Sequence, residues 1–163
     1  MKRFLVLACA LLLAFLFVAC DAEPVDDNVA PGKDYFIVYN GESVGVGINA
    51  GDIIPKLGEY KSEDGEACGT NEKDVIYTFS GMEIETHVSG DSEIVRQIKI
   101  INDSQTTPDG LTIGSTREEV IGAYGNNYTE GSSGALRYEG NTSAIEFHFG
   151  VSGNVSNIYI KRK

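Results

Sequence analysis

The chain contains the same short arrangement of glutamate and histidine at two places. Glu85 and His87 form one Glu-x-His sequence, Glu146 and His148 form the other, and these are the two histidines of the 163 residues. Residues two apart on a strand project from the same face. If the two strands adjoined, the four groups could converge on a divalent ion, because imidazole and carboxylate suit zinc and similar metals. The alternative, which we adopt, places both pairs at solvent-facing positions of amphipathic strands, so the sequence predicts no metal and no cofactor.

The remaining residues do not form the sets that common catalytic mechanisms need. Gly45-Val46-Gly47 lacks the glycine pattern and the following helix of a dinucleotide site. The glycine- and serine-rich stretch at 131–134 has no matching order of histidine and acid for a hydrolase triad. Cys68 has no neighbouring base that would activate a thiol. We therefore predict that the protein is not an enzyme.

The first twenty residues have the layout of a secretory signal. Lys2 and Arg3 precede a continuous apolar run, Phe4–Val18, which ends at Ala19 and Cys20. A membrane-spanning helix needs about 20 apolar residues, and this run is shorter. We predict a signal peptide over residues 1–19.

The end of this segment, Phe17-Val18-Ala19-Cys20, resembles the bacterial lipobox. The resemblance implies that diacylglycerol is attached to the sulfur of Cys20 and that the chain is cleaved before this residue, although Phe17 replaces the usual leucine. Each buried methylene group of fatty acyl chains such as palmitate contributes about 0.8 kcal/mol, so two chains form a stable anchor. The expected product is a lipoprotein held at the cell membrane and facing the extracytoplasmic side.

The charge balance limits the possible partners. The chain has 13 basic and 24 acidic residues, and removal of Lys2 and Arg3 would make it still more acidic. Nucleic acid and anionic headgroups would repel such a chain, so attachment to the membrane must come from the lipid. Residues 20–34 are acidic, contain two prolines and have no periodicity, which predicts a flexible tether.

The sequence compared with itself shows a weak internal repetition. Gly47 and Gly58 precede Gly114 and Gly125 by the same 67 residues, and Ile84–Val88 precedes the similar Ile145–Phe149 by 61 residues. A fixed offset is the signature of a duplicated unit. We predict a first repeat over 35–103 and a second over 104–163.

Each predicted repeat begins with a short helix. Ser115 or Thr116 can cap the second helix, with Glu118 or Glu119 completing a capping box, and Gly125 suits its end. The first helix would run from a cap at Asn49 to Gly58 and be shortened by Pro55. After each helix the apolar period changes to two, which predicts antiparallel strands. The expected strands are 35–39, 75–79, 82–88, 94–100, 136–139, 144–149 and 155–161.

The stretch GLTIGSTREEVIGAYG, followed by three short amphipathic strands, resembles the repeat of bacterial lipoproteins related to the SmpA/OmlA small lipoproteins and to the β-lactamase inhibitor protein. The resemblance covers most of Tyr35 to Lys163. It implies an α+β fold of two tandem repeats, each a short helical segment packed on an antiparallel sheet of three to four strands. It also implies a role in binding or inhibiting proteins, or in scaffolding an envelope assembly.

These observations together predict a non-enzymatic protein-binding or scaffold module of the cell envelope. It would act through the polar face of its sheet on an envelope or extracellular protein. The alternative is a small-ligand or metal-binding lipoprotein that uses the repeated Glu-x-His sequence. The predicted contact residues are Glu83, Glu85, His87, Glu146, His148 and Tyr159.

Overall fold

Antiparallel strands dominate the structure, a computed structural model that describes residues 33–65, 72–131 and 133–163. The predicted signal peptide, Cys20, Cys68 and all but the last two residues of the predicted tether lie outside these residues. In chain order the elements are β1 (Phe36–Tyr39), β2 (Glu42–Gly45), α1 (Ala50–Ile53), the 3-10 helix η1 (Ile54–Lys56), β3 (Lys61–Asp64), β4 (Glu72–Thr78), β5 (Met82–Ser89), β6 (Ser92–Ile100), α2 (Arg117–Tyr124), β7 (Thr129–Glu130), β8 (Leu136–Glu139), β9 (Ser143–Phe149) and β10 (Val155–Arg162).

The predicted α+β class, with helix-on-sheet tandem repeats, is wrong. Strands make up 47% and helices 12% of the structure, which is therefore mostly β. The helical signals in the sequence produce only four residues of α1, a short 3-10 turn containing Pro55, and eight residues of α2. The strands of the two expected units also do not form separate sheets. A sheet edge presents unpaired backbone groups, and here two such edges pair with each other instead of remaining open.

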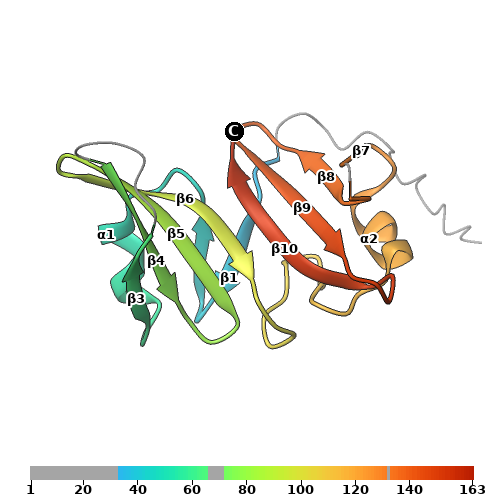
Figure 1. Cartoon of the computed structure of the whole chain (residues 1–163), viewed down its shortest axis with the longest axis horizontal. Helices are drawn as coiled ribbons and strands as arrows, with labels where there is room; N and C mark the ends of the chain where they lie inside the picture. Colours follow the sequence, from blue (N-terminus) through green and yellow to red (C-terminus); the bar gives the residue numbers. More distant parts are fainter. Residues whose placement is uncertain (1–32, 66–71, 132) are drawn as a thin grey trace, which may run out of the picture.

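The main sheet has eight strands in the order β3-β4-β5-β6-β10-β9-β8-β7, all antiparallel. Its central pair joins strands that are far apart in the sequence, β6 and β10, with Ile100 opposite Ile158 and Gln97 opposite Lys161. Figure 1 shows the sheet running from β3 on one side to β7 on the other, with β6 and β10 diverging beyond this short pairing. We call this β6–β10 junction the seam.

Each seam strand contains a β-bulge, and beyond the bulge its edge on the seam side has a different backbone partner. In β6, Arg96 is the additional residue, because Glu85 lies opposite Gln97 while Thr86 lies opposite Val95. Beyond the bulge, Val95 exchanges backbone hydrogen bonds with the segment after β2, at 2.7 Å to the Gly47 nitrogen and 2.9 Å to the Ile48 oxygen. Bulges bend a strand and end its pairing with a neighbour. The bulge in β6 therefore limits the length of the seam.

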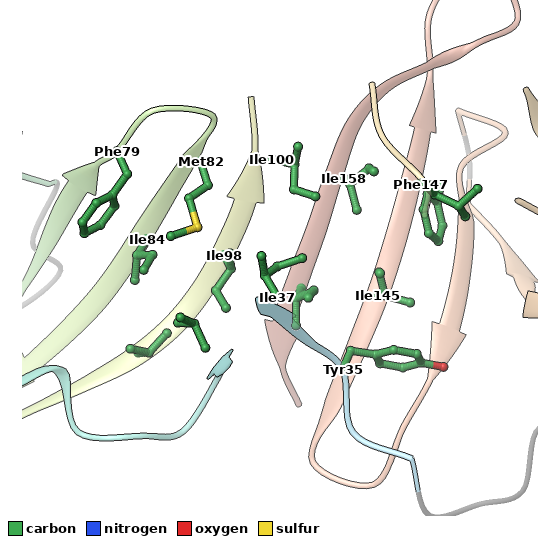
Figure 2. Close-up of a cluster of buried hydrophobic side chains, with 14 of the residues drawn as sticks. Tyr35, Ile37, Phe79, Met82, Ile84, Ile98, Ile100, Ile145, Phe147 and Ile158 are labelled. Carbon is green, nitrogen blue, oxygen red and sulfur yellow. The ribbon is translucent and has the colours of Figure 1, made fainter. Parts of the chain in front are cut away.

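The hydrophobic core lies on one side of the sheet and continues across the seam. Residues of α1, η1, α2 and the β1–β2 hairpin belong to the same buried cluster as the inward residues of the strands. Ile37 of β1 is fully buried, and Figure 2 shows it between the side chains of β6 and those of β9 and β10. The hairpin thus closes the core at the seam, where two strands far apart in the sequence meet along only four paired positions.

The predicted helix caps are confirmed. The Glu119 amide donates to Thr116 Oγ1 at 3.2 Å, and the Thr116 amide donates to the Glu119 carboxylate at 2.8 Å, which completes the capping box. The Gly51 amide donates to Asn49 Oδ1 at 2.9 Å at the start of α1. None of the described helices has the length and apolar character needed to cross a bilayer.

Candidate binding face

The six predicted contact residues lie on the side of the sheet that faces away from the core. Along β5 the buried Met82, Ile84 and Thr86 alternate with Glu83, Glu85 and His87, which are partly exposed. The same alternation in β9 and β10 brings Glu146, His148 and Tyr159 to this side. We call this side the open face, because the described helices and the β1–β2 hairpin place their buried residues in the core on the other side.

The strand register brings three of the six residues into one row across the sheet. Glu83 lies opposite Lys99, Lys99 opposite Tyr159, and Tyr159 opposite Glu146, which in turn lies opposite Arg137. Neighbouring strands are about 4.8 Å apart, so Glu83 and Glu146 are separated by roughly 14 Å. The row crosses the seam and joins the two halves of the sheet into one surface.

The two Glu-x-His sequences do not meet. His87 lies four residues from the row along β5, whereas His148 lies two residues from it on the opposite side along β9. With a rise of about 3.3 Å per residue, the two histidines are roughly 20 Å apart along the strand direction alone. The described residues contain no group of three or more His, Cys, Asp or Glu side chains placed to hold a metal ion. The convergence that a shared metal site would need is therefore not found among them.

Glu146 is the centre of a charged cluster. Its carboxylate accepts from Lys161 Nζ at 2.6 Å and contacts Arg137 and, at 3.2 Å, His148 Nε2. Burial favours the protonated acid, but the hydrogen bonds from Lys161, His148 and Arg137 outweigh burial and lower the pKa of Glu146 to about 2. A carboxylate with this pKa is a weak base at neutral pH, so Glu146 suits fixed electrostatic recognition better than proton transfer.

Tyr159 is held beside this cluster by its ring. The Tyr159 and His148 rings meet edge to face with centroids 5.1 Å apart, and Lys161 Nζ lies 4.9 Å from the Tyr159 centroid. Such contacts favour one ring orientation. A recess of about 210 Å³ borders the cluster, and its lining includes Glu146, His148, Thr129 and Ala135.

The other half of the open face is held by ion pairs between strands. Lys99 Nζ lies 3.1 Å from Glu83, and Gln97 donates to Glu85 at 3.1 Å. His87 Nδ1 lies 2.9 Å from a carboxylate oxygen of Asp74, which also accepts from the guanidinium of Arg96 at 2.9 Å. The predicted residues are thus positioned by partners on neighbouring strands.

Most of these partners were not among the residues predicted from the sequence. The signal that could have identified them is the opposite charge at outward positions of adjacent strands, which becomes visible only when the register is known. The residues in question are Asp74, Arg96, Gln97, Lys99, Arg137 and Lys161.

The fold and face together define a mostly β protein with an eight-stranded antiparallel sheet, whose polar face lies on the side away from the described helices and the β1–β2 hairpin. No protein-family model matches the sequence, and no curated protein matches it. Its fold is similar to that of an extracellular protein containing a SCP domain from Bacillus anthracis str. Ames, with a TM-score of 0.53 and 10% sequence identity. The match covers 72% of this chain and 44% of that chain, so the present chain spans less than half the length of the other protein. Likeness at this identity concerns the fold alone, and the resemblance to the small-lipoprotein and β-lactamase inhibitor group stays a prediction.

Proposed function

We propose that this chain is a lipid-anchored, extracytoplasmic binding module whose open face docks onto a protein of the cell envelope or its surroundings. The observation that carries this function is the row from Glu83 through Tyr159 to Arg137, in which charged and aromatic side chains are already held by their neighbours. Immobilising a flexible side chain on binding costs about 0.5–1.5 kcal/mol of free energy. Side chains that are already fixed before binding avoid much of this cost.

The composition of the row also suits protein recognition. Tyrosine and arginine are the residue types that most often dominate protein interfaces. Tyr159 lies near the middle of the row with its ring orientation favoured by His148 and Lys161. Glu146 and Arg137 present fixed charges on one side of it, and Glu83 and Lys99 present an equivalent pair on the other. A partner would thus meet an aromatic contact flanked by charges, which supports specificity.

The expected location follows from the N-terminal sequence. The basic start, the apolar run and Cys20 support export and lipid attachment. The extracellular description of the structural neighbour fits the same side of the membrane. The net charge of −11 argues against nucleic acid as a partner.

Capture from envelope extracts tests the binding face. The full chain, purified in detergent, is compared with Tyr159→Ala and with Tyr60→Ala, a matched control whose ring is exposed but packs beside Tyr77. We expect a partner that wild type and Tyr60→Ala retain, and that Tyr159→Ala retains at least about tenfold less, as a hot-spot contact of about 1.4 kcal/mol or more implies. If Tyr159→Ala and the charge reversal Glu83→Lys both retained the partner as well as wild type does, the open face would be rejected as the docking surface.

Lipid attachment has its own test. Cells expressing the chain are labelled with a radioactive or clickable palmitate analogue. We expect label on wild type and on the matched control Cys68→Ser, and none on Cys20→Ser. Label on Cys20→Ser at the wild-type level would contradict the predicted anchor without affecting the binding face.

A further inference from the structure

A pocket opens beside the seam, where β6 and β10 separate. It has a volume of about 370 Å³. One wall is formed by the end of β5 and the first half of β6, and the other by the end of β10 and the residue after it. The polar residues that line it are His87, Ser89, Ser92, Arg96, Arg162 and Lys163.

The lining differs in charge from the rest of the chain. Acidic residues outnumber basic residues by 24 to 13 in the whole sequence. The residues that line the pocket nevertheless include two arginines, one lysine and two serine hydroxyls, with no aspartate or glutamate among the described ones. Arginine and lysine N–H groups together with hydroxyls are the donors that bind carboxylate and phosphate oxygens.

The surrounding structure holds two of the three cations in place. Arg96 Nη1 lies 2.9 Å from Asp74 and 3.5 Å from Glu85, and these contacts leave the remaining N–H groups of the guanidinium for another acceptor. Lys163 Nζ lies 3.2 Å from Glu139. These three carboxylates are not among the lining residues, so they orient the cations from outside the pocket. They also offset much of the positive charge, so a ligand would bind through directed hydrogen bonds at short range.

Arg162 differs from the other two cations. It is exposed at the end of β10, and it forms no ion pair with another residue in the described ranges 33–65, 72–131 and 133–163. Its guanidinium can therefore engage a ligand without first breaking such a pair. An arginine presents two parallel N–H groups that match the two oxygens of a carboxylate or phosphate.

We propose that this pocket binds a small oxyanion ligand, one that carries carboxylate or phosphate groups, between Arg162 and Arg96. The volume lies near the lower end of the range of about 300–1,000 Å³ found for small-molecule sites. Such a site is additional to the protein-binding function proposed above and does not depend on it, because it needs no protein partner.

Calorimetric titration of the full chain in detergent tests this site. The probes are inorganic phosphate and citrate, with glycerol as the neutral comparison. We expect saturable binding of at least one anion and none of glycerol. Binding of citrate alone would identify a carboxylate site, and binding of phosphate alone a phosphate site.

Substitutions in the pocket connect this binding to the named residues. Arg162→Gln is expected to weaken the affinity by about tenfold or more, since it removes a charged bidentate donor. Arg96→Gln should act in the same direction, whereas Lys56→Gln, on η1 and outside the pocket lining, should leave the affinity unchanged. The site is refuted if neither anion binds saturably at concentrations up to about 10 mM, or if Arg162→Gln and Lys56→Gln bind alike.

Discussion

Replacement of Glu146 by glutamine should remove the contribution of this carboxylate to the pH dependence of the free energy of unfolding. The Glu146 side chain is 13% exposed and contacts Lys161, Arg137 and His148. Glutamine has nearly the same shape, and its neutral amide resembles the protonated acid in charge. The substitution therefore isolates the contribution of the carboxylate charge.

The size and sign of this effect follow from the lowered pKa. Hydrogen bonds from three cationic or imidazole groups overcome the opposing effect of burial and bring the pKa of Glu146 to about 2, from an ordinary value of 4.5. Because the folded protein has the lower pKa, the stabilisation is present above about pH 4.5 and disappears as the pH falls towards 2. A difference of about 2.5 in pKa corresponds to at most about 3 to 4 kcal/mol.

Urea unfolding of wild type and Glu146→Gln between about pH 7 and pH 2 measures this difference. The two free energies of unfolding should differ most at neutral pH and converge in acid. Glu130→Gln is the matched control, because it removes an ion pair to Arg117 in which the carboxylate is 55% exposed, and exposed pairs contribute about 0–1 kcal/mol. Parallel pH profiles for wild type and Glu146→Gln would refute the account of the charged cluster.

Urea unfolding also tests four further substitutions. Ile37→Ala should lower the free energy of unfolding by about 2–5 kcal/mol, since the side chain is fully buried at the seam; a loss below about 0.5 kcal/mol would show that the hairpin does not close the core. Gly122→Ala should raise it by about 0.5–1 kcal/mol, because an added methyl group in α2 meets no atom within 4 Å, and a decrease would contradict the packing of this helix. Gly140→Ala should lower it by about 1–3 kcal/mol or more, because the added atom would clash with the backbone oxygen of Lys33 and lie 2.9 Å from that of Ser143; wild-type stability would exclude that close approach. Thr116→Ala should lower it by about 0.5–2 kcal/mol through loss of the capping box, and no change would indicate that the cap contributes nothing.

Local features of the fold could be predicted from the sequence because short-range chemistry determines them. Asn40-Gly41 between β1 and β2 reads as a hairpin turn, and both residues have positive φ, +49° and +85°. Thr116 and Glu119 likewise act on atoms three residues apart. By contrast β3 (Lys61–Asp64) has no apolar residue, and each of its four residues is exposed, so its pattern gave no sign of a strand. It forms because β4 offers a free edge for pairing.

The register and pairing of the strands could be predicted only in part, because the apolar and polar patterns of the sequence specify them indirectly. Simple counting from the Gly90-Asp91 turn places Glu83 opposite Ile98, which pairs a polar position with an apolar one. The bulge at Arg96 shifts Glu83 to Lys99 and restores a charged pair. The mismatch in the pattern therefore contained a signal for the bulge. Nothing comparable in the sequence indicated that β6 would pair with β10, because many exposed edges could satisfy the same backbone groups.

The open face differs from an ordinary solvated sheet face in how its charges are arranged. Glu146, Asp74 and Glu85 have side chains only 13%, 17% and 26% exposed, although they lie on the side away from the core. Their neighbours on adjacent strands cover them, so each carboxylate has a fixed position and a fixed cationic partner. Under the proposed function, a partner must present the complementary order of charges, because a misplaced charge is repelled or left unpaired. For the same reason we expect Tyr159 to contribute most to binding affinity, since an aromatic ring can gain contact area without breaking an existing ion pair.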